Sequence, residues 1–506
     1  MNPNPILMPF ADIEAVVFHQ QPLAFDHETK NQVQKSFDFL QSFIQDKIIY
    51  GVNTGFGPMA QYRIADDQRL QLQYNLIRSH ATGQGNLLSP EMVRASLVAR
   101  YNTLSLGYSG VHPSVLELMK ELINREIYPV IFAHGGVGAS GDLVQLAHMA
   151  LSLIGEGEVW YKGERQETKK VFELEKLSPI EMHIREGLSI MNGTAVMSGI
   201  GVVNLHYAYK LLKLAIQASC LVNELVAAYD DHFSVELNRA KLHEGQLWVA
   251  EQMQEFLHDS ENIRSRQAHL YSGQNTEEIF SVKVQEYYSL RCVPQILGPV
   301  KDCLAGVEQI LVQEINSASD NPIVDLEQGQ VYHGGNFHGD YVAFEMDKMK
   351  LAITKLSMLM ERQLNYILNS KINEILPPFV NLGKLGFNFG MQGAQFTATS
   401  TTAENQTLSN SMYIHSIPNN NDNQDVVSMG TNAAVICNQV IENTFEVLAI
   451  HLMSIAQAIE ARDLQRKLST NSRKFYREIR NIVPAVYDDI ILYPYIKQLK
   501  DYIKNA

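Results

Sequence analysis

Three long stretches of this chain combine helix-favouring residues with an absence of proline, which is costly inside a helix. The clearest pattern lies in residues 346–369, where apolar side chains recur every three or four positions and so share one helix face. These side chains are Met349, Ile353, Leu356, Met360, Leu364 and Ile367. Residues 201–229 and 433–464 are apolar or helix-favouring almost throughout. We therefore expect three long helices that pack side by side in an all-α bundle.

Polar segments rich in Gly, Asn, His and Asp separate these stretches, and they comprise residues 50–60, 134–142, 322–340 and 416–430. Loops on a rigid helical scaffold often carry binding and catalytic residues, so we expect the chemistry of the protein to lie there. Within one of them, residues 324–331 are expected to form a small hairpin. We expect two domains, one at residues 1–200 and one, which contains the long helices, at residues 201–506.

The composition of the 506-residue chain narrows the classes of partner. Hydrophobic residues make up 45%, enough for large cores, and a net charge of −14 argues against nucleic acids and anionic membrane surfaces. The four cysteines have no Cys-x-x-Cys spacing, and the N-terminus lacks the pattern of a signal peptide. No apolar run approaches the roughly 20 residues of a membrane helix. We expect a cytoplasmic protein with reduced thiols and no membrane contact.

One glycine-rich segment, residues 134–143, combines small residues with a hydroxyl group and a carboxylate. Four glycines surround Ala139 and Ser140, and a backbone with so little side-chain bulk can bend sharply. If the amide nitrogen of Gly141 reaches the carbonyl carbon of Ala139, the chain can cyclise, and loss of two waters leaves an electrophilic methylidene-imidazolone. A simple tight turn before an apolar helix is the alternative. A phosphate-binding loop is disfavoured, because the Gly-Lys-Ser/Thr of a P-loop is missing.

Residues 136–143, Gly-Val-Gly-Ala-Ser-Gly-Asp-Leu, resemble the sequence motif of the aromatic amino acid ammonia-lyase family, whose methylidene-imidazolone (MIO) group forms from the Ala-Ser-Gly. Other family motifs follow in the expected order, at residues 50–57, 192–194, 288–292, 334–339 and 423–425. Within the family, the chain is most similar to bacterial tyrosine ammonia-lyases of the flavobacterial type, notably through residues 415–422.

This resemblance implies an all-α, fumarase/aspartase-like fold, with a loop-rich N-terminal region that bears the MIO group and a long central helical bundle that mediates tetramerisation. It implies a homotetramer whose active sites draw loops from three chains, so that Tyr50 and Arg291 of one site come from different subunits. The MIO group would form from Ala139, Ser140 and Gly141, with no metal and no dissociable cofactor. The bound partner would be a small aromatic amino acid.

Eliminating ammonia from an aromatic amino acid needs an electrophile for the poorly leaving amine and a base for the weakly acidic β-proton. The resemblance assigns the electrophile to Ser140, which would take the amine, or in a competing mechanism the ring, into covalent linkage. It assigns the base to Tyr50, in a loop whose glycines would let it close as a lid. Because a phenol is protonated at neutral pH, this base would need a positive helix end or hydrogen bonds to assist it.

Binding of the substrate is expected to involve a further group of polar residues. Tyr288 and Arg291 are three positions apart and share a helix face, and arginine suits the carboxylate that every α-amino acid carries. The resemblance implies that Tyr288 assists at the MIO group or the amine and that Gln285 belongs to the same polar shell. It implies that Asn192 holds the substrate or the MIO oxygen by amide hydrogen bonds. Phe337 would pack on the face of the MIO group.

Three other polar groups are not expected to carry bond chemistry. His333 and His338 have no third ligand near them in the sequence, so a metal site is not predicted there. Residues 230–232, Asp-Asp-His, are interpreted as solvated side chains or an inter-helix hydrogen-bond set. Residues 320–322, Asp-Asn-Pro, are interpreted as a turn, which in the family helps to shape the active site.

Two positions bear on the substrate, and they point in different directions. Ser79-His80 matches the Ser-His of histidine ammonia-lyases, which favours histidine. In Asn423-Gln424-Asp425, however, Gln424 stands where those enzymes carry a glutamate beside the imidazole, and a neutral amide is a weaker partner for an imidazole N–H.

His80 can instead hydrogen-bond a para-hydroxyl group, and a site built for a hydroxyl rejects the analogue that lacks it. With Asn423 and Gln424 as further substrate-binding residues, the sequence predicts elimination of ammonia from L-tyrosine to give trans-4-coumarate. The alternatives are a histidine ammonia-lyase that gives urocanate and an MIO-type aromatic aminomutase.

Overall fold

The computed structural model describes residues 7–45, 47–273, 277–280 and 283–505, and its secondary structure is mostly α-helical, which confirms the predicted fold class. The chain divides into two compact units. The first unit consists of residues 1–206, 307–347 and 411–438, and the second of residues 207–306, 348–410 and 439–506. Four of the five boundaries fall within long helices, which are α9 (Ala195–Leu225), α14 (Val293–Ile315), α15 (Asp340–Leu368) and α18 (Gly430–Ala461), and the fifth, between residues 410 and 411, lies outside the helices.

Helices α9, α15 and α18 correspond to the three predicted long helices. Helix α14 departs from the proline-based expectation, because it contains Pro294 and Pro299. Pro294 lies in the first turn, where a missing N–H costs little, whereas Pro299 lies inside the helix. Of the helices in the described part of the chain, α18 is long and apolar enough to cross a membrane, but 67% of its most apolar window is buried, which is typical of a core helix.

The first unit carries shorter helices and small antiparallel strand pairs. The helices are α1 (Phe10–His19), α2 (His27–Phe43), η1 (Gly57–Met59), η2 (Asp66–Gln68), α3 (Arg69–His80), α4 (Pro90–Ser105), α5 (Pro113–Asn124), α6 (Leu143–Leu153), α7 (Thr168–Glu175) and α8 (Glu186–Met191). Local signals set their starts: Asp26 accepts a hydrogen bond from the backbone N–H of Thr29 at the first turn of α2.

The strands are short, and each pairs antiparallel with its neighbours. Strand β1 (Gln84–Leu87) pairs with β3 (Phe132–His134), and β4 (Glu158–Tyr161) lies between β2 (Tyr128–Pro129) and β5 (Glu164–Glu167). Strands β6 (Ile323–Asp325) and β7 (Gln330–Tyr332) pair in register, which confirms the predicted hairpin.

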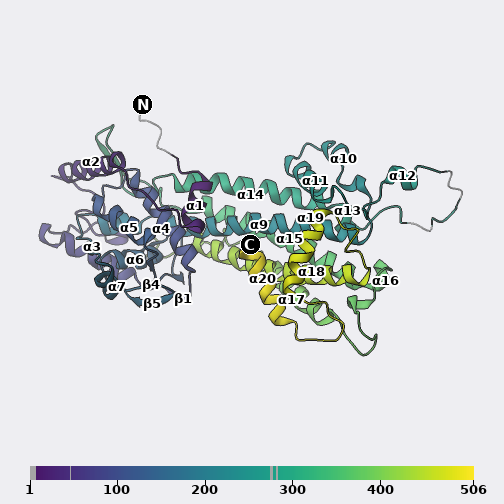
Figure 1. Cartoon of the computed structure of the whole chain (residues 1–506). Coiled ribbons are helices and arrows are strands. Elements are labelled where there is room, and N and C mark those ends of the chain that lie inside the picture. The colour runs from purple at the N-terminus through teal and green to yellow at the C-terminus, as the bar shows by residue number, and fades with distance from the viewer. Residues whose placement is uncertain (1–6, 46, 274–276, 281–282, 506) are drawn as a thin grey trace. The chain divides into compact units, whose positions relative to one another are not determined.

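The remaining elements belong to the second unit (Figure 1). They are η3 (Asp230–Phe233), α10 (Val235–Arg239), α11 (Glu244–Leu257), α12 (Arg266–Leu270), α13 (Tyr288–Arg291), α16 (Ser370–Asn373), η4 (Pro378–Val380), α17 (Gln392–Leu408), α19 (Thr470–Ile482) and α20 (Tyr493–Asn505). Buried polar side chains link the long helices within this unit. The amide of Asn405 on α17 donates to Ser357 of α15 and to Thr444 of α18, at 3.2 Å each.

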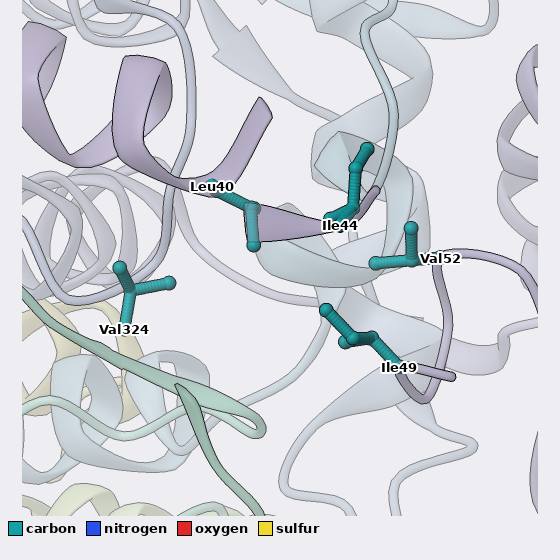
Figure 2. Packing of buried hydrophobic residues seen from close by; sticks show 5 residues of the cluster. All are labelled: Leu40, Ile44, Ile49, Val52 and Val324. Atoms are coloured by element: carbon teal, nitrogen blue, oxygen red, sulfur yellow. The ribbon is translucent and has the colours of Figure 1, made fainter. Parts of the chain in front are cut away.

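A small hydrophobic cluster holds the loop that carries Tyr50 (Figure 2). Ile49 and Val52, on either side of Tyr50, are 2% and 0% exposed and pack against Leu40 and Ile44 of the α2 end. Val324 of β6 completes the cluster. The backbone at Tyr50 is therefore anchored from both sides in the core of the first unit.

Candidate active site

A cavity of about 930 Å³ in the first unit collects most of the predicted site residues. Its lining includes Tyr50, His80, Ala139, Ser140, Asn192, Phe337, Asn423 and Gln424. Leu72, Leu76, Leu143 and Leu188 supply apolar wall, which suits the ring of an aromatic ligand. All lining residues are in the described part of the chain, and none of them is a lysine or an arginine. The cavity by itself therefore offers no permanent cation to a substrate carboxylate.

The turn at residues 139–141 lies against the backbone that follows α8. Gly141 has φ +67°, and a Cβ there would lie 1.9 Å from the carbonyl oxygen of Gly193. Gly141 and Gly193 form a parallel bridge, and the backbone N–H of Asp142 donates to the Gly193 oxygen at 2.8 Å. Position 141 therefore accepts only glycine, for reasons of both backbone conformation and space.

The other side of the turn is equally close-packed. Gly138 has φ +76°, and a Cβ there would lie 2.0 Å from Oγ of Ser428. Ala139 is 4% exposed and packs in a small cluster with Val427 and Met429. The low side-chain bulk of this segment is thus required by the segment at residues 427–429, which lies against it.

Asp142 anchors the turn to the start of a long helix. One carboxylate oxygen of this fully buried residue accepts the backbone N–H groups of Val196 and Met197, in the first turn of α9, at 2.8 and 2.9 Å. The other accepts from the hydroxyl of Thr431. Burial raises the pKa of Asp142 to about 6, although these hydrogen bonds oppose the shift. The first four N–H groups of a helix have no partner within the helix, so they favour a negative charge at its start.

Tyr50 has a hydrogen-bond donor at its phenol oxygen. The backbone N–H of Gly57 donates to this oxygen at 2.9 Å. The backbone N–H of Tyr50 in turn donates to Nε2 of His333 at 3.4 Å. A donated N–H stabilises negative charge on a phenolate oxygen. Hydrogen bonding, one of the two aids expected for this base, is thus available from the loop itself.

Asn192 is held by a buried ion pair. Its Nδ2 donates to Oδ1 of Asp320 at 3.0 Å and to the backbone oxygen of Asn321 at 3.2 Å. The carboxylate of Asp320 also pairs with Arg185 at 3.1 Å, and both of these side chains are fully buried. Because both acceptors are fixed, the amide N–H groups of Asn192 are committed within the protein. The atom left for a ligand is the carbonyl oxygen, an acceptor.

His80 presents one defined nitrogen as an acceptor. Its Nδ1 lies 2.9 Å from the backbone oxygen of Leu76, one turn earlier in α3, and 3.1 Å from Oγ of Ser79. A carbonyl oxygen can only accept, so Nδ1 carries the proton in this contact. In the neutral imidazole, Nε2 is then an acceptor, suited to a ligand hydroxyl.

Gln424 contacts the serine of the turn directly. Its Nε2 donates to Oγ of Ser140 at 2.9 Å. The loop that carries it is closed by backbone pairing between Asn419 and Gln424. Between them, residues 420–422 all have positive φ, from 52° to 57°, which Asn and Asp tolerate better than other side chains. The repeated Asn and Asp residues therefore allow this loop to adopt its left-handed backbone conformation.

The remaining predicted residues lie in the second unit and do not line this cavity. There Gln285, Tyr288 and Arg291 form a cluster of their own. The guanidinium of Arg291 donates to the amide oxygen of Gln285 and lies 4.8 Å from the ring centroid of Tyr288. Tyr288 is 70% exposed. The predicted site thus falls into two groups, a cavity group and an exposed group that carries the cation.

Comparison with known proteins places the chain in a family. The profile described as aromatic amino acid lyase matches residues 8–481. A tyrosine 2,3-aminomutase from Myxococcus sp. is 36% identical, and the alignment covers 97% of this chain and 94% of that protein. A histidine ammonia-lyase from Caldanaerobacter subterraneus is 35% identical, over 98% of this chain and 94% of that protein. The solved tyrosine aminomutase from Streptomyces globisporus has a TM-score of 0.94 at 34% identity, covering 98% of this chain and 95% of that one.

The chain belongs to the aromatic amino acid lyase family. Members of this family use an MIO group made from an Ala-Ser-Gly tripeptide. The residues of this chain fit such a group: Gly141 lies against a backbone that excludes any side chain, and Ser140 lies at the cavity with a donor on its hydroxyl. Within the described residues, no group of three His, Cys, Asp or Glu side chains is placed to hold a metal.

Several contacts of this chain were not identified from its sequence. The Asp320–Arg185 pair that holds Asn192 joins residues 135 positions apart. The Asp-Asn-Pro pattern placed Asp320 in a turn that, by the resemblance, helps to shape the active site, but it did not indicate the contacts with Arg185 and Asn192. His333 and His338, which were not expected to bind a metal, contact the backbone of other loops. His333 accepts a hydrogen bond from the N–H of Tyr50, and Nε2 of His338 lies 3.2 Å from the backbone oxygen of Val426. In the second unit, Asp231 pairs with Arg266.

Proposed function

We propose that this lyase eliminates ammonia from L-tyrosine to give trans-4-coumarate, as the flavobacterial-type tyrosine ammonia-lyases that it resembles do. The observation that carries this proposal is the hydrogen bonding of His80, a residue that lines the cavity, because it leaves Nε2 as an acceptor. A para-hydroxyl donates to such a nitrogen, and the imidazole is left unpaired by a phenylalanine ring. Gln424 adds support, because it is neutral and its N–H is directed at Ser140.

The predicted residues at the cavity have separate roles in this reaction. When formed from Ala139-Ser140-Gly141, the MIO group supplies an electrophile that makes the amine a better leaving group. Tyr50 removes the β-proton, assisted by the N–H that Gly57 donates to its oxygen. The carbonyl oxygen of Asn192 accepts from the substrate ammonium, and Phe337 packs beside the reacting centre.

The carboxylate of the substrate requires a cation that the cavity lacks. Arg291 is the predicted partner, and in this chain it lies in the exposed cluster of the second unit with Tyr288 and Gln285. A guanidinium binds a carboxylate through two parallel hydrogen bonds. We therefore extend the proposal to a homotetramer in which Arg291 of one subunit completes the cavity of another.

Two other activities remain as candidates, each with its own support. The tyrosine 2,3-aminomutase from Myxococcus sp. acts, by its name, on tyrosine with a different outcome, and it is 36% identical to this chain. For histidine, Ser79-His80 matches the family motif, and the carboxylate of Asp425 lines the cavity, where it can pair with an imidazole. Formation of β-tyrosine or of urocanate distinguishes these activities from formation of coumarate.

The hydroxyl-recognition role of His80 is tested by a matched pair of variants. His80→Leu removes the acceptor, and we expect the preference for tyrosine over phenylalanine to fall by about tenfold or more. His80→Gln keeps an acceptor and should retain most of the preference. The measurement is kcat/KM for coumarate and for cinnamate formation. An unchanged ratio in His80→Leu would mean that the hydroxyl is recognised elsewhere.

A further inference from the structure

We propose that Ser428 and Thr431 are positioning residues for the cyclisation of Ala139-Ser140-Gly141. This inference rests on the proposed function, because it concerns the formation of the MIO group. The two side chains are 0% and 1% exposed, and they come from one short segment at the start of α18. Their hydrogen bonds reach residues 290 and 289 positions earlier in the chain. They touch the two flanks of the tripeptide, one on each side.

The upstream flank is held at consecutive peptide groups. Oγ of Ser428 donates to the backbone oxygen of Gly138 at 3.1 Å, and the N–H of Gly339 donates to the same oxygen at 3.3 Å. One residue earlier, the oxygen of Val137 accepts from the N–H of Met429 at 3.0 Å. The peptide plane that leads into the tripeptide is therefore fixed by bonds to the segment 428–429 and to Gly339.

The downstream flank is held by a side chain from the same segment. The hydroxyl of Thr431 donates to one carboxylate oxygen of Asp142, whose other oxygen accepts from the start of α9. The N–H of Asp142 donates to Gly193 at 2.8 Å. With both ends held, the three residues between them have few conformations left, and residues 428–431 supply one hydroxyl to each end.

This restriction matters for a reaction between two backbone groups. In ring closure, the nitrogen of Gly141 bonds to the carbonyl carbon of Ala139. The oxygen of Ala139 leaves as water with one proton from the Gly141 nitrogen and one from the Ser140 nitrogen. A C=N bond then joins the carbon of Ala139 to the nitrogen of Ser140. A second water takes the hydroxyl of Ser140 and its α-proton, and leaves a C=C bond. No oxidant or reductant is needed. The first step is slow unless the two atoms are held close together, since misplacement of reacting groups costs large factors in rate.

The test is the intact mass of freshly purified protein, followed over time, because each cyclised chain is lighter by two waters. Thr431→Val removes the hydroxyl at nearly constant shape, and Ser428→Ala removes the other. We expect each to slow dehydration on the order of tenfold or more. Thr431→Ser keeps the hydroxyl and should mature as the wild type does. Ser454→Ala is the control, since Ser454 is a buried hydroxyl of α18 that bonds only within its helix, to Ile450.

Each outcome has a defined meaning when circular dichroism shows a native helix content. Slow dehydration in Ser428→Ala and Thr431→Val, with normal dehydration in Thr431→Ser and Ser454→Ala, supports the proposal. Full dehydration at the wild-type rate in both hydroxyl-lacking variants overturns it, as does an equal delay in Ser454→Ala. If one variant does not fold, the other decides. A wild-type protein that never loses two waters contradicts the proposed function itself.

Discussion

At the scale of single residues, the site depends on positions where only one kind of residue fits. Gly141 combines a left-handed backbone with a carbonyl group 1.9 Å from where a Cβ would be. Asn192 depends on a carboxylate that is itself neutralised by Arg185. Removing one member of such a buried pair leaves an uncompensated charge, which is strongly destabilising. Gly141 and Asn192 are thus held by Gly193 and by the Asp320–Arg185 pair, which have no proposed part in the chemistry.

Gly141→Ala is expected to prevent formation of the turn. The left-handed conformation costs an alanine about 1–2 kcal/mol, and the overlap with Gly193 raises the total loss of unfolding free energy above about 3 kcal/mol. Gly163→Ala is the matched control, because Gly163 has φ +80° but no atom within 4 Å of an added Cβ. Thermal unfolding and intact mass are the measurements. Equal stability losses in the two variants would show that the contact with Gly193 is unimportant.

Ser140→Ala removes the hydroxyl that dehydration requires. We expect a folded protein without the loss of two waters and with kcat lowered by more than about a thousandfold. Mass spectrometry and the rate of product formation check the two parts separately. Full turnover in this variant would contradict the assignment of Ser140.

The sequence identified the residues that a local motif marks, such as Ser140, Tyr50 and Gln424, and the structure collects these around one cavity. It did not identify Ser428, and it placed Asp320 in a turn that helps to shape the active site without indicating the partners of either side chain. Their roles follow from hydrogen bonds to residues 290 and 128 positions away. Such contacts exist only once the chain has folded.

At the scale of elements, the short helix α8 connects the stability of the first unit to the site. Its first residue, Glu186, accepts the backbone N–H groups of His112 and His183, at 2.7 Å each. Its last residue precedes Asn192. Burial raises the pKa of Glu186 to about 7, well above its ordinary value.

This shift predicts the sign of a pH effect. Because the folded protein holds the proton of Glu186 more tightly than the unfolded chain, the stability from this group is present below the ordinary pKa of about 4.5 and is lost as pH rises toward about 7. We expect the unfolding free energy of the wild type, minus that of Glu186→Gln, to fall by about 2 kcal/mol between about pH 5 and about pH 7.5, because only the wild type carries the titrating group. Urea unfolding at both pH values measures it, and an equal difference at both would contradict the assignment.

The elements were predictable where one periodic pattern covered a whole helix. Residues 346–369 gave the position of α15, because its buried face repeats every three or four residues. Helix α14 was missed because Pro299 lies inside it, where the rule on proline predicts an interruption. The rule describes an average cost, which a long helix with a buried face can offset.

At the scale of the whole molecule, the main feature is that the two predicted groups belong to different units. The cavity holds Tyr50 and Ser140 but no lysine or arginine among its lining residues, whereas Arg291 lies in the exposed cluster of the second unit. Under the proposed function, Arg291 supplies the cation, and we propose that it does so to the cavity of another subunit, as the resemblance implies.

Co-expression of two inactive variants tests this sharing. Tyr50→Phe and Arg291→Ala should each lower kcat/KM strongly when expressed alone. In randomly mixed oligomers, a site needs an unaltered Tyr50 from one chain and an unaltered Arg291 from another, so up to about a quarter of the sites recover. The activity of purified mixed oligomers measures this. No recovery, in oligomers shown to contain both chains, would place both residues of a site in one subunit.

The central claim is tested most directly by the products that the purified protein forms from L-tyrosine, L-phenylalanine and L-histidine, each incubated separately. Ultraviolet absorbance distinguishes coumarate, cinnamate and urocanate, and chromatography of the tyrosine reaction detects β-tyrosine. We predict coumarate from tyrosine, with much less cinnamate and urocanate. Urocanate from histidine as the main product, or β-tyrosine in place of coumarate, would contradict the account.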